Sequence, residues 1–142
     1  MKTLTNQTAV QIHLGAIGIK ALYEESLTAK QVDFVCLSSN YSRVVGAYFD
    51  KDYAPRLFGS QVATREILPN NPVNEANNKA AKNQVRYMEI TETSESDLLL
   101  FNGKAVLVSY NPESPFAVEV SDKELVANFR NQFEALWKEL SA

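Results

Sequence analysis

The stretch ESDLLLFNGKAVLVSY, residues 95–110, holds two apolar runs on either side of Asn102-Gly103. Asn-Gly suits the positive φ angles of a type I′ turn, so the stretch predicts a β-hairpin. Glu95 and Asp97 stand directly before the first run. Carboxylates this close in sequence can act as an acid and a base when they are buried, whereas an acidic loop before a strand is usually a solvated edge.

The chain outside the hairpin alternates between strand and helix patterns. Further strands are expected at residues 8–14, 32–39, 61–69, 85–90 and 115–121, from period-two alternation and short β-rich apolar runs. Helices are expected at 16–30, 40–58 and 73–82. A strand–helix–strand opening is typical of α/β proteins, so we expect a single α/β domain over residues 1–142.

The last segment, residues 121–140, has the clearest helical pattern. Ser121 is the expected N-cap, and Glu124 three residues later completes a capping box. One face of this amphipathic helix carries an apolar stripe, formed by Leu125, Phe129, Phe133, Leu136, Trp137 and Leu140. We expect the stripe to dock on the core, and a dimer seam along part of it is the alternative.

The composition is that of an ordinary globular domain, with 45% hydrophobic and 22% charged residues and a net charge of −3. Residues 40–87 hold seven basic and four acidic residues, whereas residues 89–124 hold eight acidic and two basic ones. This asymmetry indicates either solvated loops of mixed charge or a functional dipole. We expect no nucleic-acid binding by the chain itself, because such domains usually carry a basic face. No secretory leader is visible and no apolar stretch approaches the roughly 20 residues of a membrane span, so we expect a cytoplasmic protein.

Few side chains are suited to catalysis or metal binding. His13 is the single histidine and is expected at the surface, and Cys36 lies in an apolar run that predicts a buried thiol. No zinc-binding or phosphate-loop motif is present, so we expect no metal and no cofactor. Ser38, Ser39 and Asn40 follow a probable central strand, where open α/β sheets place ligands. A simple strand-to-loop cap is the alternative for these three residues.

The hairpin stretch also resembles, in degenerate form, the His-x-Lys-x-x-x-x-Asp motif of phospholipase D-like enzymes. When the turn glycine is aligned with Gly103, Glu95 replaces the histidine, Asp97 the lysine and Asn102 the aspartate. The small Gly-Ser pair of that family falls on Ser109-Tyr110. In the enzymes the histidine is the nucleophile. Two carboxylates at these positions repel a phosphodiester, so the resemblance implies that the chemistry is lost.

The chain as a whole resembles the degenerate phospholipase D-like sensor domain of TrmB-type transcriptional regulators, over roughly residues 9–140. The resemblance rests on GAIGIKALYEESL, YAPRLFGSQVATREILP and FNGKAVLVSYNPESPFAVEVSDKELVANFRNQFEALW. It implies a phospholipase D-like mixed β-sheet flanked by helices, closing with a long C-terminal amphipathic helix. It also implies a homodimer and a small effector, which is a sugar in the best-known branch. The additional segment of that branch is not found here.

In that family the sensor domain follows a helix-turn-helix, and this chain begins about where the sensor domain begins. We therefore expect DNA contact only through an N-terminal helix-turn-helix that the chain lacks. The candidate ligand-binding residues lie at strand ends: Ser38, Ser39, Asn40, Arg65, Glu95, Asp97 and Ser109. Arg65 is the candidate for an anionic effector because its planar fork suits carboxylate or phosphate. A strand-surface arginine paired with Glu66 or another acid is the alternative.

Three functions follow from these observations. The first is a non-enzymatic sensor and dimerisation domain of a TrmB-like regulator. The second is a structural adaptor without a ligand, whose dimer surface uses aromatic residues of segment 48–58 and of the last helix. The third is a phospholipase D-like phosphodiesterase, in which His13 has to replace the missing nucleophile.

Overall fold

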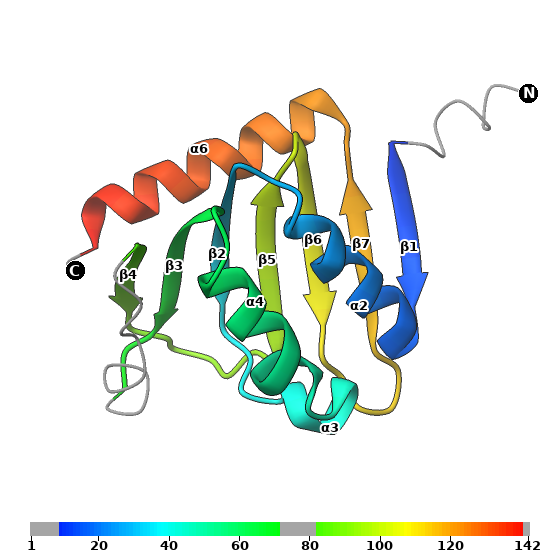
Figure 1. Cartoon of the computed structure of the whole chain (residues 1–142). Helices are drawn as coiled ribbons and strands as arrows, with labels where there is room; N and C mark the ends of the chain where they lie inside the picture. Colours follow the sequence, from blue (N-terminus) through cyan, green and yellow to red (C-terminus); the bar gives the residue numbers. More distant parts are fainter. Residues whose placement is uncertain (1–8, 72–81, 141–142) are drawn as a thin grey trace, which may run out of the picture.

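The structure, a computed structural model, describes residues 9–71 and 82–140. Within these ranges one mixed sheet has the strand order β1-β7-β6-β5-β2-β3-β4 (Figure 1). Its strands are β1 (Val10–Leu14), β2 (Gln31–Cys36), β3 (Ala63–Pro69), β4 (Asn83–Met88), β5 (Ser96–Phe101), β6 (Lys104–Ser109) and β7 (Phe116–Val120). Strands β2, β3 and β4 are parallel to one another, and the remaining neighbours are antiparallel.

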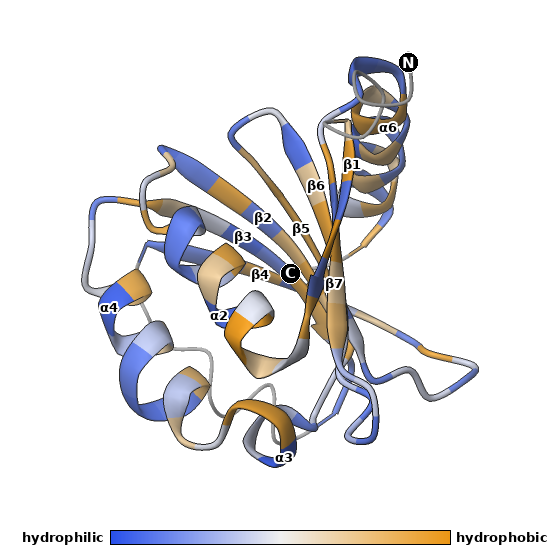
Figure 2. Ribbon diagram, turned by 90° about the vertical axis from the view of Figure 1, so that its right-hand side faces the viewer, coloured by the Kyte–Doolittle hydropathy of each residue, from blue (hydrophilic) through white to orange (hydrophobic). Residues whose placement is uncertain are grey.

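Helices cover both faces of this sheet. One face carries α2 (Gly15–Ser26), α3 (Tyr41–Val45), the π-helical turn η1 (Tyr48–Tyr53) and α4 (Ala54–Phe58). The long helix α6 (Lys123–Glu139) crosses the opposite face, so the molecule has three layers (Figure 2). This is the expected architecture. The helix predicted at 73–82 falls almost entirely outside the described residues.

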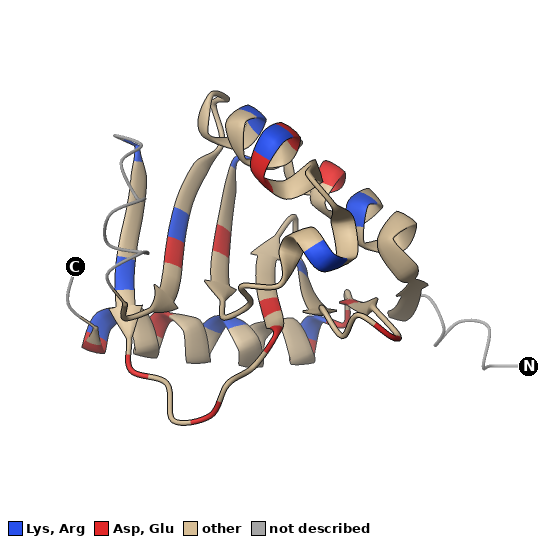
Figure 3. Ribbon diagram, turned by 90° about the horizontal axis from the view of Figure 1, so that it is seen from below, with Lys and Arg blue, Asp and Glu red and all other residues tan. Residues whose placement is uncertain are grey.

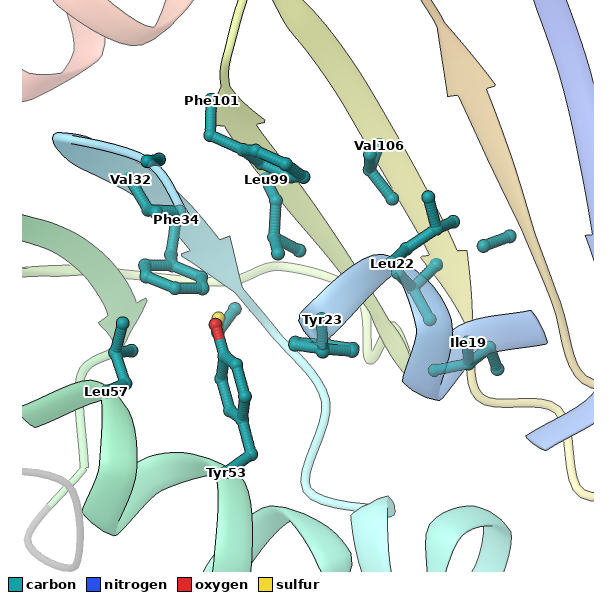
Figure 4. Close-up of a cluster of buried hydrophobic side chains, with 14 of the residues drawn as sticks. Ile19, Leu22, Tyr23, Val32, Phe34, Tyr53, Leu57, Leu99, Phe101 and Val106 are labelled. Atoms are coloured by element: carbon teal, nitrogen blue, oxygen red, sulfur yellow. The ribbon is translucent and has the colours of Figure 1, made fainter. Parts of the chain in front are cut away.

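The alternation of side chains along the central strands creates two cores. On the α2 face, Val32 and Phe34 of β2 and Leu99 of β5 pack with α2, η1 and α4 (Figure 4). Cys36 is buried in this core with a free thiol, as predicted. On the other face, α6 inserts its aromatic residues between apolar side chains of β3, β5, β6 and β7.

The hairpin at Asn102-Gly103 forms as predicted. Both residues have positive φ angles, 49° and 70°, and the strands pair in register from Phe101↔Lys104 to Ser96↔Ser109. These φ values are the left-handed pair that a type I′ turn requires, which explains why Asn-Gly occupies this position.

The start of α6 differs from the prediction. Asp122 is the N-cap, because its Oδ2 accepts a hydrogen bond from the backbone N–H of Leu125 at 2.9 Å. The predicted capping box of Ser121 and Glu124 is therefore wrong by one residue. Phe133 and Trp137 are buried whereas Leu125 is exposed, so the apolar stripe docks through its C-terminal part.

The first strand also differs from a simple core strand. Val10, Ile12 and Leu14 form the apolar face of β1, and all three are exposed. Helix α2 begins at once after this strand and ends at Ser26, four residues before the predicted end. Within the described residues, none of the helices combines the length and the apolarity needed to cross a membrane.

Candidate functional site

A cavity of about 670 Å³ lies at the carboxyl ends of β2 and β3, on the face that carries α3, η1 and α4. Its lining includes the aromatic side chains Phe34, Tyr41, Phe49, Tyr53 and Phe58. Three carboxyl groups also line it, those of Asp50, Glu66 and Glu95. The strand-end position is where open α/β sheets place their ligands, and the volume lies within the range of small-molecule sites.

Asp97 lies behind the wall of this cavity and is almost completely buried. Its Oδ2 accepts hydrogen bonds from the hydroxyl groups of Tyr23 and Tyr41, at 2.9 and 2.7 Å. Its Oδ1 accepts one from the backbone N–H of Ser38 at 3.3 Å, and the Tyr110 hydroxyl donates to that of Tyr23 at 2.7 Å. Burial raises the pKa of Asp97 to about 6, against the effect of the tyrosine hydrogen bonds.

Glu66 enters the cavity from β3 and is 8% exposed. Its Oε2 accepts a hydrogen bond from the side-chain amide of Asn83. Its Oε1 accepts none from the described residues. Burial raises the pKa of Glu66 to about 7, with a further increase from the negative charge of Asp97, although the Asn83 hydrogen bond opposes both. The cavity therefore contains a carboxyl group that is partly ionised at neutral pH.

Glu95 lies at the rim and organises the turn after β2. Its Oε1 accepts hydrogen bonds from Ser38 Oγ at 3.1 Å and from the backbone N–H of Ser39 at 2.9 Å. Ser38 Oγ in turn accepts from the backbone N–H of Asn40 at 3.0 Å, and Asn40 Nδ2 donates to the carbonyl of Tyr110. Ser38, Ser39 and Asn40 thus form a strand-to-loop cap, and Ser38 and Ser39 line the cavity as well.

Two of the seven candidate residues lie on the other face of the sheet. Arg65 donates through Nε and Nη2 to the two carboxyl oxygens of Asp33, both at 2.9 Å, and also pairs with Glu134 of α6. The structure therefore does not bring Arg65 to the strand-end cavity, and its guanidinium is already occupied by two acids. Ser109 lines a separate, largely apolar groove of about 880 Å³ beneath α6.

The three positions of the degenerate motif do not converge. Glu95 and Asp97 lie at the cavity end of β5, whereas Asn102 occupies the hairpin turn and donates to Thr28 Oγ1 at 3.2 Å. At about 3.3 Å per residue, roughly 20 Å separate the two ends. His13 is held 2.8 Å from a carboxyl oxygen of Glu119 and does not line the cavity.

The charged groups of this end of the sheet were only partly foreseen from the sequence. Figure 3 shows acidic residues on β3, on β5 and along the loop that leads from β4 to β5. Glu66 was missed as a cavity residue, and so was Tyr41. The signal for Glu66 was its place on the inward face of β3, between the buried Thr64 and Leu68, where a charge is unusual.

No family model and no curated protein matches the sequence. Several solved structures are similar. TrmBL2, described as an archaeal chromatin protein with a novel mode of DNA binding, matches with a TM-score of 0.62 and 16% identity, over 94% of this chain and 54% of TrmBL2. NucT from Helicobacter pylori matches with a TM-score of 0.69 and 9% identity, over 94% of this chain and 98% of NucT.

Nuc from Salmonella typhimurium, a phospholipase D family member, matches with a TM-score of 0.63 and 12% identity, over 93% of this chain and 95% of Nuc. This chain therefore spans nearly all of Nuc and NucT but only about half the length of TrmBL2. Identities this low show the fold alone. The chain has the phospholipase D-like fold, in the form that Nuc and the matched half of TrmBL2 share.

Proposed function

We propose that the chain is a non-enzymatic, effector-binding domain of a TrmB-like transcriptional regulator. The observation that carries the proposal is the strand-end cavity, which is large enough for a metabolite and whose described lining holds carboxyl and aromatic groups but no histidine, lysine or arginine. Catalysis by such a fold needs an activated nucleophile at the substrate, held within hydrogen-bond reach of its base.

The contacts of the former motif positions argue against phosphodiester hydrolysis. Asp97 is bound by two tyrosine hydroxyls and one backbone N–H, and Glu95 is bound by the turn after β2. Both side chains thus act as acceptors that hold the fold together. Their negative charge also disfavours a phosphate at this point of the sheet.

The cavity also favours an effector domain over a ligand-free adaptor. An adaptor has no need for open space beside buried carboxyl groups, because such groups are less costly when they are paired or replaced by apolar side chains. The raised pKa values of Glu66 and Asp97 reflect this cost. Perturbed carboxyl groups in a cavity are a common sign of a functional site.

We further propose a homodimer that uses the edge of the sheet at β1. This strand ends the sheet order, and Ile12, Leu14 and Ile17 beside it are 66%, 76% and 85% exposed. An open edge flanked by large apolar side chains is a natural site for pairing with a second copy. Sedimentation velocity should show a dimer for the chain and a monomer for Ile12→Lys. A monomeric parent chain would contradict this part of the proposal.

DNA is expected to bind to a helix-turn-helix outside these residues and not to this domain, whose net charge is −3. A cytoplasmic location is part of the same proposal.

Binding and hydrolysis assays on the same preparation test the proposal. Thermal melts with a panel of sugars, nucleotides, phosphorylated metabolites and amines should reveal at least one class that raises the unfolding midpoint, because a ligand of the folded state stabilises it by mass action. Bis(p-nitrophenyl) phosphate should not be hydrolysed. Indifference to every class would contradict effector binding. Hydrolysis that is lost in His13→Ala would favour the phosphodiesterase.

A further inference from the structure

We propose that the strand-end cavity binds a small organic cation, an amine with an apolar or aromatic body. This inference rests on the proposed effector-binding role and gives that role a ligand class.

The charged side chains among the described residues of the cavity lining are all acidic. Asp50, Glu66 and Glu95 line the cavity, Asp97 lies directly behind, and no Lys, Arg or His is among the described residues of the lining. None of the ion pairs in residues 9–71 and 82–140 involves these four carboxyl groups. An anionic ligand would be repelled here, whereas a cation would supply the missing counter-charge.

Glu66 provides a specific acceptor for such a ligand. Its side chain is held from one side by Asn83 Nδ2 on Oε2, and Oε1 accepts no hydrogen bond from the described residues. Burial is the main cause of its raised pKa, Asn83 of β4 lowers the pKa, and Asp97 of β5 raises it. The Tyr53 hydroxyl and the Cys36 thiol are the other titratable groups that interact with its charge. Oε1 can therefore accept a hydrogen bond from the ammonium or guanidinium N–H of a ligand in the cavity.

The aromatic wall selects the kind of cation. Tyr41 and Phe49 are stacked with ring centroids 4.0 Å apart, and Phe49 lies 5.6 Å from Tyr53. Aromatic faces attract cations and also bury apolar surface, so they favour an organic ammonium over a hydrated metal ion. Among the described residues, no group of three or more His, Cys, Asp or Glu is arranged to hold a metal.

Three compounds with one body and different charges provide the test: 2-phenylethylamine, 2-phenylethanol and phenylacetate. Isothermal titration calorimetry of the whole chain at about pH 8, where Glu66 is mostly ionised, should give the amine an affinity at least about ten-fold above those of the neutral and anionic analogues. Lowering the pH to about 6 should weaken amine binding by up to about ten-fold, because Glu66 then becomes protonated.

Variants locate the site. Glu66→Gln should lower amine affinity by at least about ten-fold, because it removes the buried charge and keeps the shape. Ser39→Arg should do the same by placing a positive charge at the exposed rim. This second variant changes a surface side chain and so tests the site even if Glu66→Gln folds poorly. Glu134→Gln, the same carboxyl-to-amide change on the other face, should bind the amine as the parent does.

Each result decides one point. Equal or tighter binding of phenylacetate or 2-phenylethanol would overturn the proposal that the ligand is a cation, and would leave the effector role intact. Unchanged amine binding in both Glu66→Gln and Ser39→Arg would overturn the proposed location of the amine site in the strand-end cavity. If neither 2-phenylethylamine nor aliphatic amines bind while sugars or phosphorylated compounds raise the melting midpoint, the ligand class alone is wrong. If no compound of any class binds, the proposed function itself falls.

Discussion

Asp33 and Glu66 are buried carboxyl groups on neighbouring strands of one sheet, and they face opposite layers. Asp33 receives hydrogen bonds from Arg65, Arg130 and Gln31. Among the described residues, Glu66 receives one, from the neutral amide of Asn83. Burial acts to raise the pKa of both groups, but the two arginines outweigh it at Asp33 and hold that pKa below its usual value. At Glu66 burial prevails and the pKa rises to about 7.

The difference separates a charge that builds the fold from one that is available to a ligand. Arg65 links Asp33 of β2 to Glu134 of α6 and stacks over the ring of Phe133 at 4.9 Å, so this pair fastens the long helix to the sheet. Glu66 forms no ion pair with the described residues and lines the strand-end cavity. A buried charge without a counter-ion lowers the stability of the fold. Such a charge is expected where a bound ligand can neutralise it.

The largest expected effect comes from Asp33→Ala. The substitution leaves Arg65 and Arg130 without their shared acceptor, and breaking a buried ion pair in this way costs about 3–5 kcal/mol of unfolding free energy. Denaturant unfolding at neutral pH measures it. Glu134→Gln, at an exposed partner of the same Arg65, is the control and should cost less than about 1 kcal/mol. Equal losses in the two variants would mean that the buried pair has no special structural role.

The next largest loss of stability is expected when a tyrosine hydroxyl beside Asp97 is removed. Tyr41→Phe removes a donor 2.7 Å from a buried carboxyl oxygen and should cost about 1.5–3 kcal/mol at pH values where Asp97 is ionised. The loss should shrink below about pH 6, as Asp97 is protonated. Tyr48→Phe, which removes a hydroxyl bonded to the exposed Glu24, is the matched control and should change stability much less. A loss that does not depend on pH would point to packing instead of hydrogen bonding.

Glu66→Gln should have the opposite effect and stabilise the protein by about 1–2 kcal/mol near pH 8, because it removes a buried charge that forms no ion pair with the described residues. The folded-state pKa of Glu66 lies above its ordinary value of 4.5, so the folded protein binds more protons between about pH 4.5 and 7. The parent chain therefore loses stability relative to the variant as the pH rises through that window. Unfolding curves of both proteins between pH 4.5 and 8 measure the gap, which should widen with pH.

At Asp33 the stability of the parent relative to its variant should change with pH in the opposite direction. Its pKa is lowered on folding, so its contribution is complete above its unfolded-state pKa and disappears as the pH falls through the lowered folded-state pKa. The gap between the parent and Asp33→Ala should therefore narrow in acid. If the stability of the parent relative to its variant changed with pH in the same direction at Asp33 and at Glu66, the proposed difference between the two groups would be contradicted.

The smallest effect is expected at the rim. Glu95→Gln keeps the acceptor oxygen that receives Ser38 Oγ and the backbone N–H of Ser39, and Glu95 is only partly buried. Stability should change by less than about 1 kcal/mol in denaturant unfolding. A loss as large as that of Tyr41→Phe would show that the charge of Glu95, and not only its hydrogen bonds, supports the turn after β2.

Much of the fold was predictable because it is coded locally. The Asn102-Gly103 turn, the alternating strands and the apolar stripe of α6 each follow from a few neighbouring residues. Local patterns also set the limits of the prediction. Ser121 and Asp122 are both good N-caps, so sequence could not decide between them, and Asp122 is the one whose carboxyl reaches the Leu125 N–H.

The site was predictable only in outline because its partners are distant in sequence. Ser38, Ser39 and Glu95 do meet at strand ends, since β5 pairs with β2 in the centre of the sheet. Arg65 was misplaced because neighbouring residues of a strand point to opposite faces, and Arg65 and Glu66 therefore enter different layers. The arginine partners of Asp33 lie 32 and 97 residues away, which no local pattern reveals.

The most direct test is an NMR titration of the side-chain carboxyl carbons of Asp33, Glu66 and Asp97 in one sample of the whole chain. Glu66 should titrate near pH 7 and Asp97 near pH 6, while Asp33 should remain ionised below its usual range. Saturation with 2-phenylethylamine should lower the pKa of Glu66 and leave that of Asp33 unchanged. If Glu66 titrates like an ordinary exposed glutamate, or does not respond to the amine, Glu66 is not a buried cavity carboxyl that binds a cation.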